Sequence, residues 1–577
     1  MRRVLLVAII VALALALRIS HRRQATEPLL AFPPYDDLYH AKRIAWTAAH
    51  FPHALEYDDD RRAWCPWPPL YDLACAAGAR LAGAATDAEV YETVAWFPPI
   101  GFAVFAGVVA MAVGWRSRAG AIAGTTAGAT LAISPYLITT SEIGSIDHHW
   151  TEPALMLAIV AATVHAYRSG SRAEAWQRGA ILGAVIVIAM FVQPAFLAAA
   201  ALAFTSLFCL GEAKAETRQA PLIAGTGAFA IAAVACVLYR TTRPPGYPDS
   251  AWFLGWTHVA IFAGAAVACG ICASFESRKR WQTRGIALIA GALAALSFPR
   301  ALDALPDGIR FFRGDPWLAT IIEFQPMLRD PSRLGTDLAN LTGGAALAFV
   351  LAWQAWRHRT RRILALFAIA YFVLALSSRR FLVPGIALFA VSGATVACDF
   401  VNNRRRTLGA LAMAATLLPP LCYDIHAIAR PEPQPASDEV DLVRAALALR
   451  SLPPGRVLAP WSYGHAIDVI GRHGVALDNF GSMPDSAGFR RNIEALLSSD
   501  EDALASYCHD QSIRFLVLPD PTIRLGAMSA TIGIPNAVYA PSSRRAQSTV
   551  WWRAYKGRGL TRFSLVMRGN VQVWTNQ

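Results

Sequence analysis

Long apolar stretches recur over the first three quarters of the chain, separated by short polar segments. A bilayer core of roughly 30 Å is crossed by about 20 helical residues, so such stretches predict transmembrane helices. Some are shorter than this, and one neighbouring pair is divided only by Gln193-Pro194. The spans, about thirteen in number, lie near residues 3–18, 92–114, 119–138, 150–167, 179–192, 194–210, 220–238, 254–274, 284–298, 340–356, 361–377, 381–401 and 406–424. The pattern predicts a polytopic α-helical membrane protein.

Every second loop between these spans is rich in Lys and Arg, although some residues of the other loops are basic too (Arg22, Arg23, Arg240 and Arg379). Lys and Arg in short loops mark the cytoplasmic side, and with the N-terminus inside every predicted inner loop is basic. The basic residues there are Arg116, Arg118, Arg168, Arg172, Arg178, Lys214, Arg218, Arg278, Lys279, Arg280, Arg284 and the arginines within 357–362 and 404–406. These loops account for much of the net charge of +13, so a nucleic-acid partner is not needed to explain it. We expect a multi-pass protein of the cell (cytoplasmic) membrane.

An odd number of spans leaves the C-terminal quarter on the outer side. Proline alternates with polar residues over 431–435, which indicates a linker, and Ser437 with the acids after it is typical of a helix start. Short strand-like runs at 456–459, 475–478 and 514–518 then alternate with a helical pattern at 490–507. The prediction is a transmembrane domain over 1–430 and an extracytoplasmic α/β domain over 431–577.

Two predicted outer loops are unusually long, at 19–91 and 299–339. Loops beyond about 15 residues are commonly functional or disordered. Both contain Trp, Pro, Tyr and charged residues at high density, which disfavours disorder. Only 16% of the whole chain is charged and 55% is hydrophobic, whereas soluble domains carry about 25% charged residues. The charged groups of the outer loops are therefore candidates for chemistry.

Three outer segments carry carboxylates or imidazoles, at 35–40, 144–152 and 320–323. The predicted topology puts all three on one side of the membrane, so they can converge on one site. Carboxylate and imidazole groups together suit a divalent cation, and a set dominated by carboxylates favours Mg²⁺ or Mn²⁺ over Zn²⁺. Taken alone, an Asp-His-His before a helix is more often a cap or a surface cluster, because acids favour helix N-termini.

Together, these segments resemble the catalytic subunit of the oligosaccharyltransferases. The matching motifs are Asp36-Asp37-Leu38-Tyr39-His40, Asp147-His148-His149 with Glu152, Thr320-Ile321-Ile322-Glu323, and Arg380-Phe381 before a late span. The resemblance covers nearly the whole chain. It implies a glycosyltransferase of the GT-C type, with thirteen spans, two long outer loops and a C-terminal outer domain.

The resemblance also implies a reaction and a set of site residues. The family transfers a preassembled glycan from a polyprenyl diphosphate in the membrane to an asparagine of an acceptor protein, with a bound cation. Asp36 and Glu323 are expected to act on the acceptor amide. Arg380 is expected to assist at the diphosphate or to select an acidic acceptor residue. The implied metal ligands are Asp36, Asp147, His149 and Glu323, with Asp37, His148 and Glu152 as further possibilities.

The chain departs from the family in one motif. Where the family has Trp-Trp-Asp-Tyr-Gly, which helps bind the hydroxyl of the acceptor sequon, this chain has Pro460-Trp461-Ser462-Tyr463-Gly464. Acceptor contact is therefore predicted at Trp461, Ser462 and Tyr463. A serine cannot supply a charge-assisted hydrogen bond, which is roughly twice as strong as a neutral one.

Two other functions stay open at this point. One is a related membrane glycosyltransferase that uses a lipid-linked sugar and a different acceptor, such as a hydroxyl, a lipid or a glycan. The other is a transporter or flippase of lipid-linked glycans. Transporters place ionisable residues and broken helices near the membrane midplane, whereas the spans of this chain are nearly free of charge.

Overall fold

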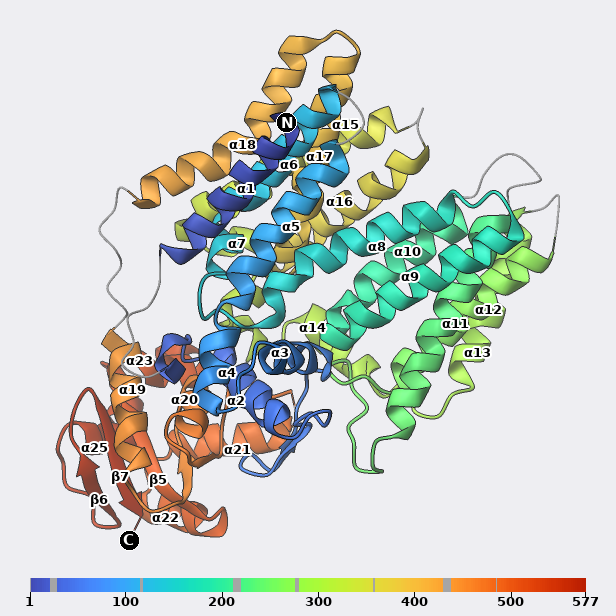
Figure 1. Ribbon diagram of the computed structural model, residues 1–577. Helices are drawn as coiled ribbons and strands as arrows, with labels where there is room; N and C mark the ends of the chain where they lie inside the picture. The colour runs from blue at the N-terminus through green and yellow to red at the C-terminus, as the bar shows by residue number, and fades with distance from the viewer. Residues whose placement is uncertain are drawn as a thin grey trace.

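The computed structural model describes residues 2–20, 28–114, 118–210, 219–275, 280–355, 359–428, 437–483 and 485–576. A bundle of long helices stands above a smaller globular part that contains the main sheet (Figure 1). The predicted linker at 431–435 lies outside the described residues. So do several of the predicted inner-loop basic residues, namely Arg116, Lys214, Arg218, Arg278, Lys279 and the arginine at 357.

Helices form at all thirteen predicted spans. They are α1 (Arg2–Ile19), α5 (Phe97–Gly114), α6 (Arg118–Ile133), α8 (Glu152–Tyr167), α9 (Arg172–Val192), α10 (Leu197–Cys209), α11 (Gln219–Thr241), α12 (Trp256–Ser274), α13 (Arg280–Leu296), α15 (Leu334–Gln354), α16 (Arg359–Ser377), α17 (Leu382–Asn402) and α18 (Arg406–Ile428). Among the described residues, seven helical segments are long and apolar enough to cross a membrane by themselves. The prediction of a polytopic helical membrane protein is confirmed.

The bundle is built around α17. In the apolar part of the helical segment that contains it, Arg379–Asn402, 78% of the residues are buried. Small residues let its neighbours approach closely. A Cβ on Gly344 of α15 would lie 2.1 Å from the carbonyl oxygen of Phe389 in α17.

The helices α9 and α10 are separated by a break at Gln193. Gln193 has extended backbone angles because Pro194 follows it, so α9 ends there and α10 begins after one short turn. At this break the Gln193 side chain contacts the His148 ring.

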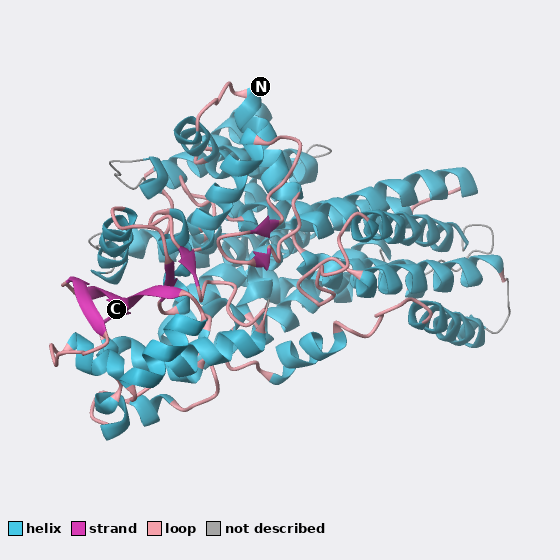
Figure 2. Cartoon of the chain, turned by 90° about the horizontal axis from the view of Figure 1, so that it is seen from below, coloured by secondary structure: helices cyan, strands magenta, loops and turns pink. Residues whose placement is uncertain are grey.

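The first long loop is folded rather than irregular. It contains α2 (Asp36–Ala49), the two-residue strands β1 (Tyr57–Asp58) and β2 (Ala63–Trp64), α3 (Leu70–Leu81) and α4 (Asp87–Val94). The second long loop contains α14 (Leu305–Arg313) and the short 3₁₀ turns η5 (Leu318–Thr320), η6 (Ile322–Phe324), η7 (Met327–Arg329) and η8 (Pro331–Arg333). In Figure 2 the strands of the described chain occupy two places, the small hairpin of the first loop and the C-terminal sheet.

The C-terminal part is an α/β fold with five strands in the order β4-β3-β5-β7-β6. The strands β3, β4 and β5 pair in parallel, and β7 pairs antiparallel with β5 and β6. The strands are β3 (Arg456–Leu458), β4 (Gly474–Val475), β5 (Ile513–Pro519), β6 (Phe563–Met567) and β7 (Val571–Asn576). The helices are α19 (Ser437–Arg450), α20 (Gly464–Val469), α21 (Ser486–Leu496), α22 (Glu501–Asp510), α23 (Pro521–Ala530), α24 (Arg544–Ser548) and α25 (Val550–Tyr555).

The globular part packs directly on the first long loop. The ammonium of Lys42 in α2 lies 2.9 Å from a carboxylate oxygen of Asp468 in α20. The guanidinium of Arg61, between β1 and β2, lies 2.5 Å from Asp478. Both pairs are mostly buried, so the loop and the sheet domain hold each other in one arrangement. This contact brings the first loop, the ends of the membrane helices and the C-terminal domain to one place.

Candidate active site

The loop before α8 is fixed against the first long loop. Gly144 has a φ of +87°, and a Cβ there would lie 2.6 Å from the carbonyl oxygen of Ala31. Only glycine fits such a position without strain. Two residues later, the carbonyl of Ile146 accepts a hydrogen bond from the Tyr71 hydroxyl at 2.5 Å. The next residue, Asp147, is therefore held at a defined position at the end of the bundle that meets the first long loop.

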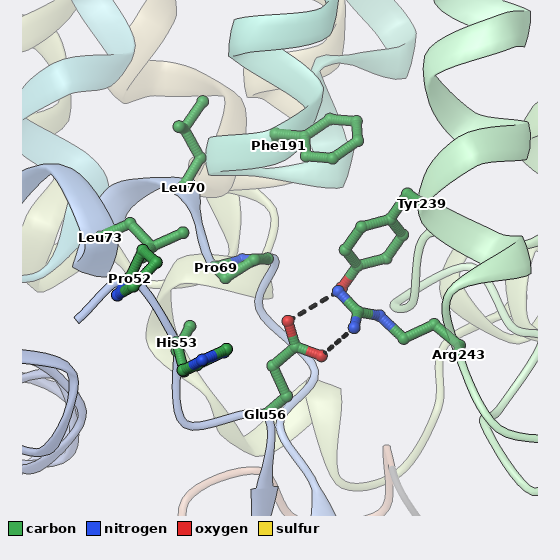
Figure 3. Close-up of a pocket in the computed structure, with 10 residues that line it drawn as sticks. Pro52, His53, Glu56, Pro69, Leu70, Leu73, Phe191, Tyr239 and Arg243 are labelled. Atoms are coloured by element: carbon green, nitrogen blue, oxygen red, sulfur yellow. Dashed lines mark hydrogen bonds and ion pairs between the residues drawn. The ribbon is translucent and has the colours of Figure 1, made fainter. Parts of the chain in front are cut away.

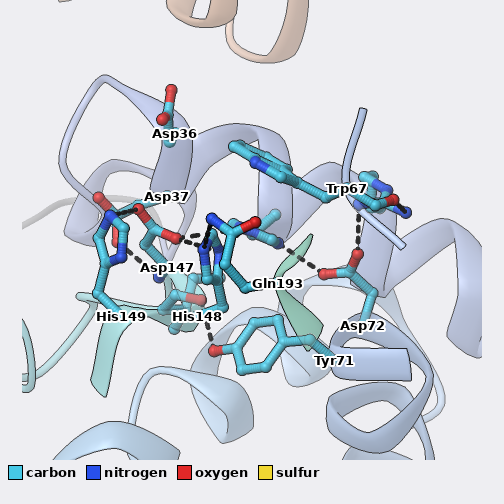
Figure 4. A network of polar contacts seen from close by, with 12 residues as sticks. Asp36, Asp37, Trp67, Tyr71, Asp72, Asp147, His148, His149 and Gln193 are labelled. Atoms are coloured by element: carbon cyan, nitrogen blue, oxygen red, sulfur yellow. Dashed lines mark hydrogen bonds and ion pairs between the residues drawn. The ribbon is translucent and has the colours of Figure 1, made fainter. Parts of the chain in front are cut away.

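Asp147 is the centre of the polar cluster in Figure 4. Its Oδ1 lies 2.7 Å from Nδ1 of His148, and its Oδ2 lies 3.1 Å from Nε2 of His149. Its backbone N–H donates to Oδ1 of Asp37 at 3.0 Å. Burial alone would raise the pKa of Asp147, but the two imidazoles outweigh it and hold that pKa well below its usual value. Burial and the Asp147 charge raise the pKa of Asp37 to about 7.

Glu323 and Arg380 join this cluster from two further segments. Oε2 of Glu323, in η6, lies 3.7 Å from Nε2 of His149 and 3.9 Å from Nη1 of Arg380. The short turn η9 (Arg379–Phe381) carries Arg380 and also anchors the second long loop. There the Ser378 hydroxyl donates to the Glu323 carbonyl at 3.2 Å. Burial raises the pKa of Glu323, although Arg380 and His149 oppose that shift.

Glu152 lies behind His149 and Arg380. Its Oε1 accepts from Nη2 of Arg380 at 2.7 Å and lies 2.9 Å from Nδ1 of His149. Nη1 of Arg380 lies 2.6 Å from the same ring nitrogen, which can donate to the carboxylate or accept from the guanidinium but not both. When Nδ1 donates to Glu152, Nε2 of His149 is left as an electron-pair donor facing Asp147 and Glu323. Glu152 thus orients His149.

The cluster fits a divalent cation. Adjacent ligands of an octahedral ion with bonds of 2.1 Å stand about 3 Å apart. Oδ2 of Asp147 and Oε2 of Glu323 lie 3.1 and 3.7 Å from Nε2 of His149. Two groups of three among the described residues have ligand atoms that all lie within 4.8 Å of one another, His40 with Asp147 and His148, and His148 with His149 and Glu152. Of the four predicted ligands, the structure therefore places Asp147 and Glu323 each beside His149.

Asp36, the fourth predicted ligand, stands at the margin of the cluster. In Figure 4 its carboxylate points away from Asp147 and His149. It is close enough for its charge to add to burial and to Asp147 in raising the pKa of Glu323. Its side chain is 36% exposed, and its Oδ1 lies 3.5 Å from Nε2 of His465 in the C-terminal domain.

A deeper layer under the cluster contains Asp72 and Trp67, which the sequence does not predict, together with His40 and His148 of the predicted motifs. Nδ1 of His40 lies 2.7 Å from Oδ1 of Asp72, which leaves Nε2 facing Oδ1 of Asp147 at 3.5 Å. The His40 ring is stacked on Trp67, with centroids 4.3 Å apart. Burial alone would lower the pKa of His40, but Asp72 and Asp147 raise it to about 9. A usable signal was the spacing of Asp36 and His40, which puts both on one face of a helix.

His148 belongs to this deeper layer. Its Nδ1 lies 3.3 Å from Nε2 of His40, and its Nε2 lies 2.9 Å from the side-chain amide of Gln193. It is almost fully buried, and burial lowers its pKa. The helix break at Gln193-Pro194 supplies this last contact. His148 therefore packs beneath Asp147, whereas His149 faces the second loop.

The predicted acceptor segment lies in the C-terminal domain as the turn η10 (Trp461–Tyr463). Trp461 packs edge-on against Trp317 of the second long loop, with ring centroids 5.9 Å apart. Tyr463 is buried and lines a cavity of about 220 Å³, with the Arg524 guanidinium 5.6 Å from its ring centroid. Ser462 is half-buried between them. His465, two residues beyond this turn, is the residue that reaches Asp36.

A second cavity, of about 430 Å³, lies between the first long loop and the C-terminal ends of α9 and α11 (Figure 3). Glu56 and Arg243 form an ion pair of 2.5 Å there, and the guanidinium lies 4.0 Å from the Tyr239 ring centroid. Phe191 and Leu70 are among its apolar lining residues. None of the predicted site residues lines this cavity.

The long apolar helices, with the acidic cluster at their ends and an α/β domain beside it, define a polytopic helical membrane protein. Residues 5–243 match the family "Oligosaccharyl transferase STT3, N-terminal", so this part of the chain is similar to the oligosaccharyltransferases that its motifs resemble. No curated protein sequence matches the chain significantly.

Solved structures extend the relationship to the whole fold. The archaeal oligosaccharyltransferase AglB from Archaeoglobus fulgidus, in complex with an inhibitory peptide and a dolichol-phosphate, matches with a TM-score of 0.79 and 15% identity over 98% of this chain and 79% of that one. The Archaeoglobus fulgidus enzyme tethered to an acceptor peptide with an NVT sequon gives a TM-score of 0.76, and its complex with Zn and sulfate gives 0.71. Both are 16% identical over 98% of this chain and 79% of theirs. These matches establish the fold.

Proposed function

We propose that this chain is an oligosaccharyltransferase that moves a preassembled glycan from a polyprenyl diphosphate to an asparagine side chain of an acceptor protein. The observation that carries the proposal is the meeting of Asp147, His149, Glu323 and Arg380, which come from three distant segments of a chain with the oligosaccharyltransferase fold. The related archaeal structures with dolichol-phosphate and with an NVT peptide support both substrate classes.

Asp36 and Glu323 act on the acceptor amide. An amide nitrogen is a poor nucleophile because its lone pair is delocalised into the carbonyl group. Carboxylates that accept its two N–H bonds oppose this delocalisation. Asp36 suits that role because its side chain is 36% exposed. Glu323 suits it because its side chain is 28% exposed at the edge of the cluster.

Asp147, His149 and Glu323 hold the cation, and Asp36 completes the set. We propose Mg²⁺ or Mn²⁺, because carboxylate oxygens dominate these ligands. When bound, the cation stabilises the negative charge of the leaving diphosphate. Arg380 contributes a second positive charge, and its pairing with Glu152 at 2.7 Å keeps the guanidinium beside the cluster.

The proposal also fixes the place of the reaction. The basic inner loops put the site and the domain from residue 431 onward on the outer side of the cytoplasmic membrane, with residues 1–430 forming the transmembrane domain. The acceptor approaches along the turn that carries Trp461, Ser462 and Tyr463.

Transfer to a peptide tests the proposal. We expect the purified chain, with Mn²⁺ and a synthetic polyprenyl diphosphate carrying an N-acetylglucosamine disaccharide, to modify an Asn-x-Thr peptide but not its Gln-x-Thr counterpart. Mass spectrometry of the fragmented peptide locates the added sugar. Glu323→Gln should slow this transfer by about a hundredfold, because it removes one charge from the site.

Glu494→Gln is the matched control, since Glu494 forms an exposed pair with Arg490 on the outside of α21. It should transfer at the rate of the unmodified chain. Sugar found on a threonine hydroxyl, or on no peptide while the carrier is consumed, would contradict the asparagine acceptor and favour a glycosyltransferase with another acceptor.

A further inference from the structure

His465 is a histidine of the C-terminal domain that is completely buried against the first long loop. Its exposed fraction is 0%. The ring stacks on Tyr39, with centroids 4.8 Å apart and planes inclined by 17°, and it meets the edge of Phe480 at 4.9 Å. Packing on two sides fixes the direction in which the ring nitrogens point.

One of these nitrogens is aimed at Asp36. Nε2 of His465 lies 3.5 Å from Oδ1 of Asp36. Within the described part of the chain, neither ring nitrogen of His465 nor that carboxylate oxygen has a hydrogen-bond partner, although all three atoms are buried. A buried polar atom without a hydrogen-bond partner costs about 1–3 kcal/mol of stability. An imidazole held next to a carboxylate at this cost is therefore a candidate for a functional residue. Catalytic hydrogen bonds are often long before substrate binds and shorten afterwards.

The approach of the two residues is built into the fold. A Cβ on Gly464 would lie 2.3 Å from the carbonyl oxygen of Leu477, so only glycine lets α20 start at that place. At the other end of α20, Asp468 pairs with Lys42 of α2 at 2.9 Å. Lys42 lies six residues after Asp36 on the same helix. The two helices are thus clamped so that His465 faces Asp36.

We propose that His465 is a positioning residue for Asp36 in the proposed transfer reaction. The imidazole N–H donates a hydrogen bond to Oδ1 of Asp36. This contact directs the second carboxylate oxygen toward the cation and the acceptor amide. His465 follows the predicted acceptor turn at 461–463 directly after Gly464. The domain that receives the acceptor therefore also sets the orientation of the carboxylate that acts on it.

His465→Phe tests this role, because phenylalanine keeps the stacking on Tyr39 but has no N–H. We expect kcat to fall by about 10- to 100-fold with the KM values for carrier and peptide unchanged, and Mn²⁺ affinity of the full chain to fall by a similar factor. His465→Gln, which restores an N–H donor, should regain part of both. In an Asp36→Glu background, His465→Phe should have little further effect, because its action passes through Asp36.

His473→Phe is the matched control. His473 is also a buried histidine of this domain, but its ring nitrogens contact the carbonyls of Gly455 and Leu449 at 3.0 and 2.8 Å. It should lower the thermal unfolding temperature without changing kcat or Mn²⁺ affinity. Transfer and Mn²⁺ affinity at unmodified levels in His465→Phe would overturn the inference and leave the proposed function intact. If the unmodified chain transfers no glycan, the proposed function fails, and the Mn²⁺ titrations still decide the role of His465.

Discussion

Asp147→Ala is expected to abolish glycan transfer while the chain still folds. Asp147 contacts His148 with one carboxylate oxygen and His149 with the other, at 2.7 and 3.1 Å. Both the proposed cation and the orientation of the imidazoles therefore depend on it. A cation on a reacting phosphate oxygen contributes several kcal/mol to catalysis, and a loss of about 4 kcal/mol corresponds to about a thousandfold in rate.

The measurement combines transfer rates with Mn²⁺ titration of the purified chain. Asp147→Ala should show neither detectable Mn²⁺ binding nor transfer. Asp500→Ala is the control, because Asp500 caps α22 far from the cluster and its loss should cost only about 1 kcal/mol of stability. A variant without Asp147 that binds Mn²⁺ as tightly as the unmodified chain would place the cation elsewhere.

The membrane helices could be predicted because their signal is local. Each span satisfies its backbone hydrogen bonds within itself, so length and apolar composition are sufficient evidence. The break between α9 and α10 was also visible, since Pro194 cannot continue a helix. Local sequence patterns are weaker evidence in the C-terminal domain. They do not predict β6 and β7, which follow the last predicted strand of that domain. They also merged 490–507 into one helical pattern, although Asp500 caps a separate helix at Glu501.

The candidate site was predicted from residue types rather than from distances. The motifs at 144–152 and 320–323 contain Asp147, His149 and Glu323, and the structure brings these three together. The position of Asp36 could not be predicted, because it depends on how the C-terminal domain packs on α2. Asp72 had no signal at all, since a buried carboxylate on an otherwise ordinary helix is recognisable only through its partners in space.

The largest expected effect on stability comes from those partners. Arg43 is fully buried in α2, and its Nη1 lies 2.7 Å from Oδ2 of Asp72 in α3. Its Nε and Nη2 donate to the carbonyls of Leu55 and Trp67, both at 3.2 Å. Arg43 and His40 together hold the pKa of the buried Asp72 carboxylate below its usual value despite burial. Removing one partner of such a pair leaves an uncompensated charge and typically costs about 3–5 kcal/mol.

Arg43→Met should therefore lower the unfolding free energy by about 3–5 kcal/mol, measured by thermal or denaturant unfolding in detergent. The double variant Arg43→Met with Asp72→Leu removes both charges and should recover much of this stability. It should not recover transfer, because His40 has then lost the carboxylate that orients it toward Asp147. Stability and transfer restored together would show that the Asp72–His40 pair serves folding only. Stability restored without transfer would show that the Asp72–His40 pair also orients the residues of the proposed cation site.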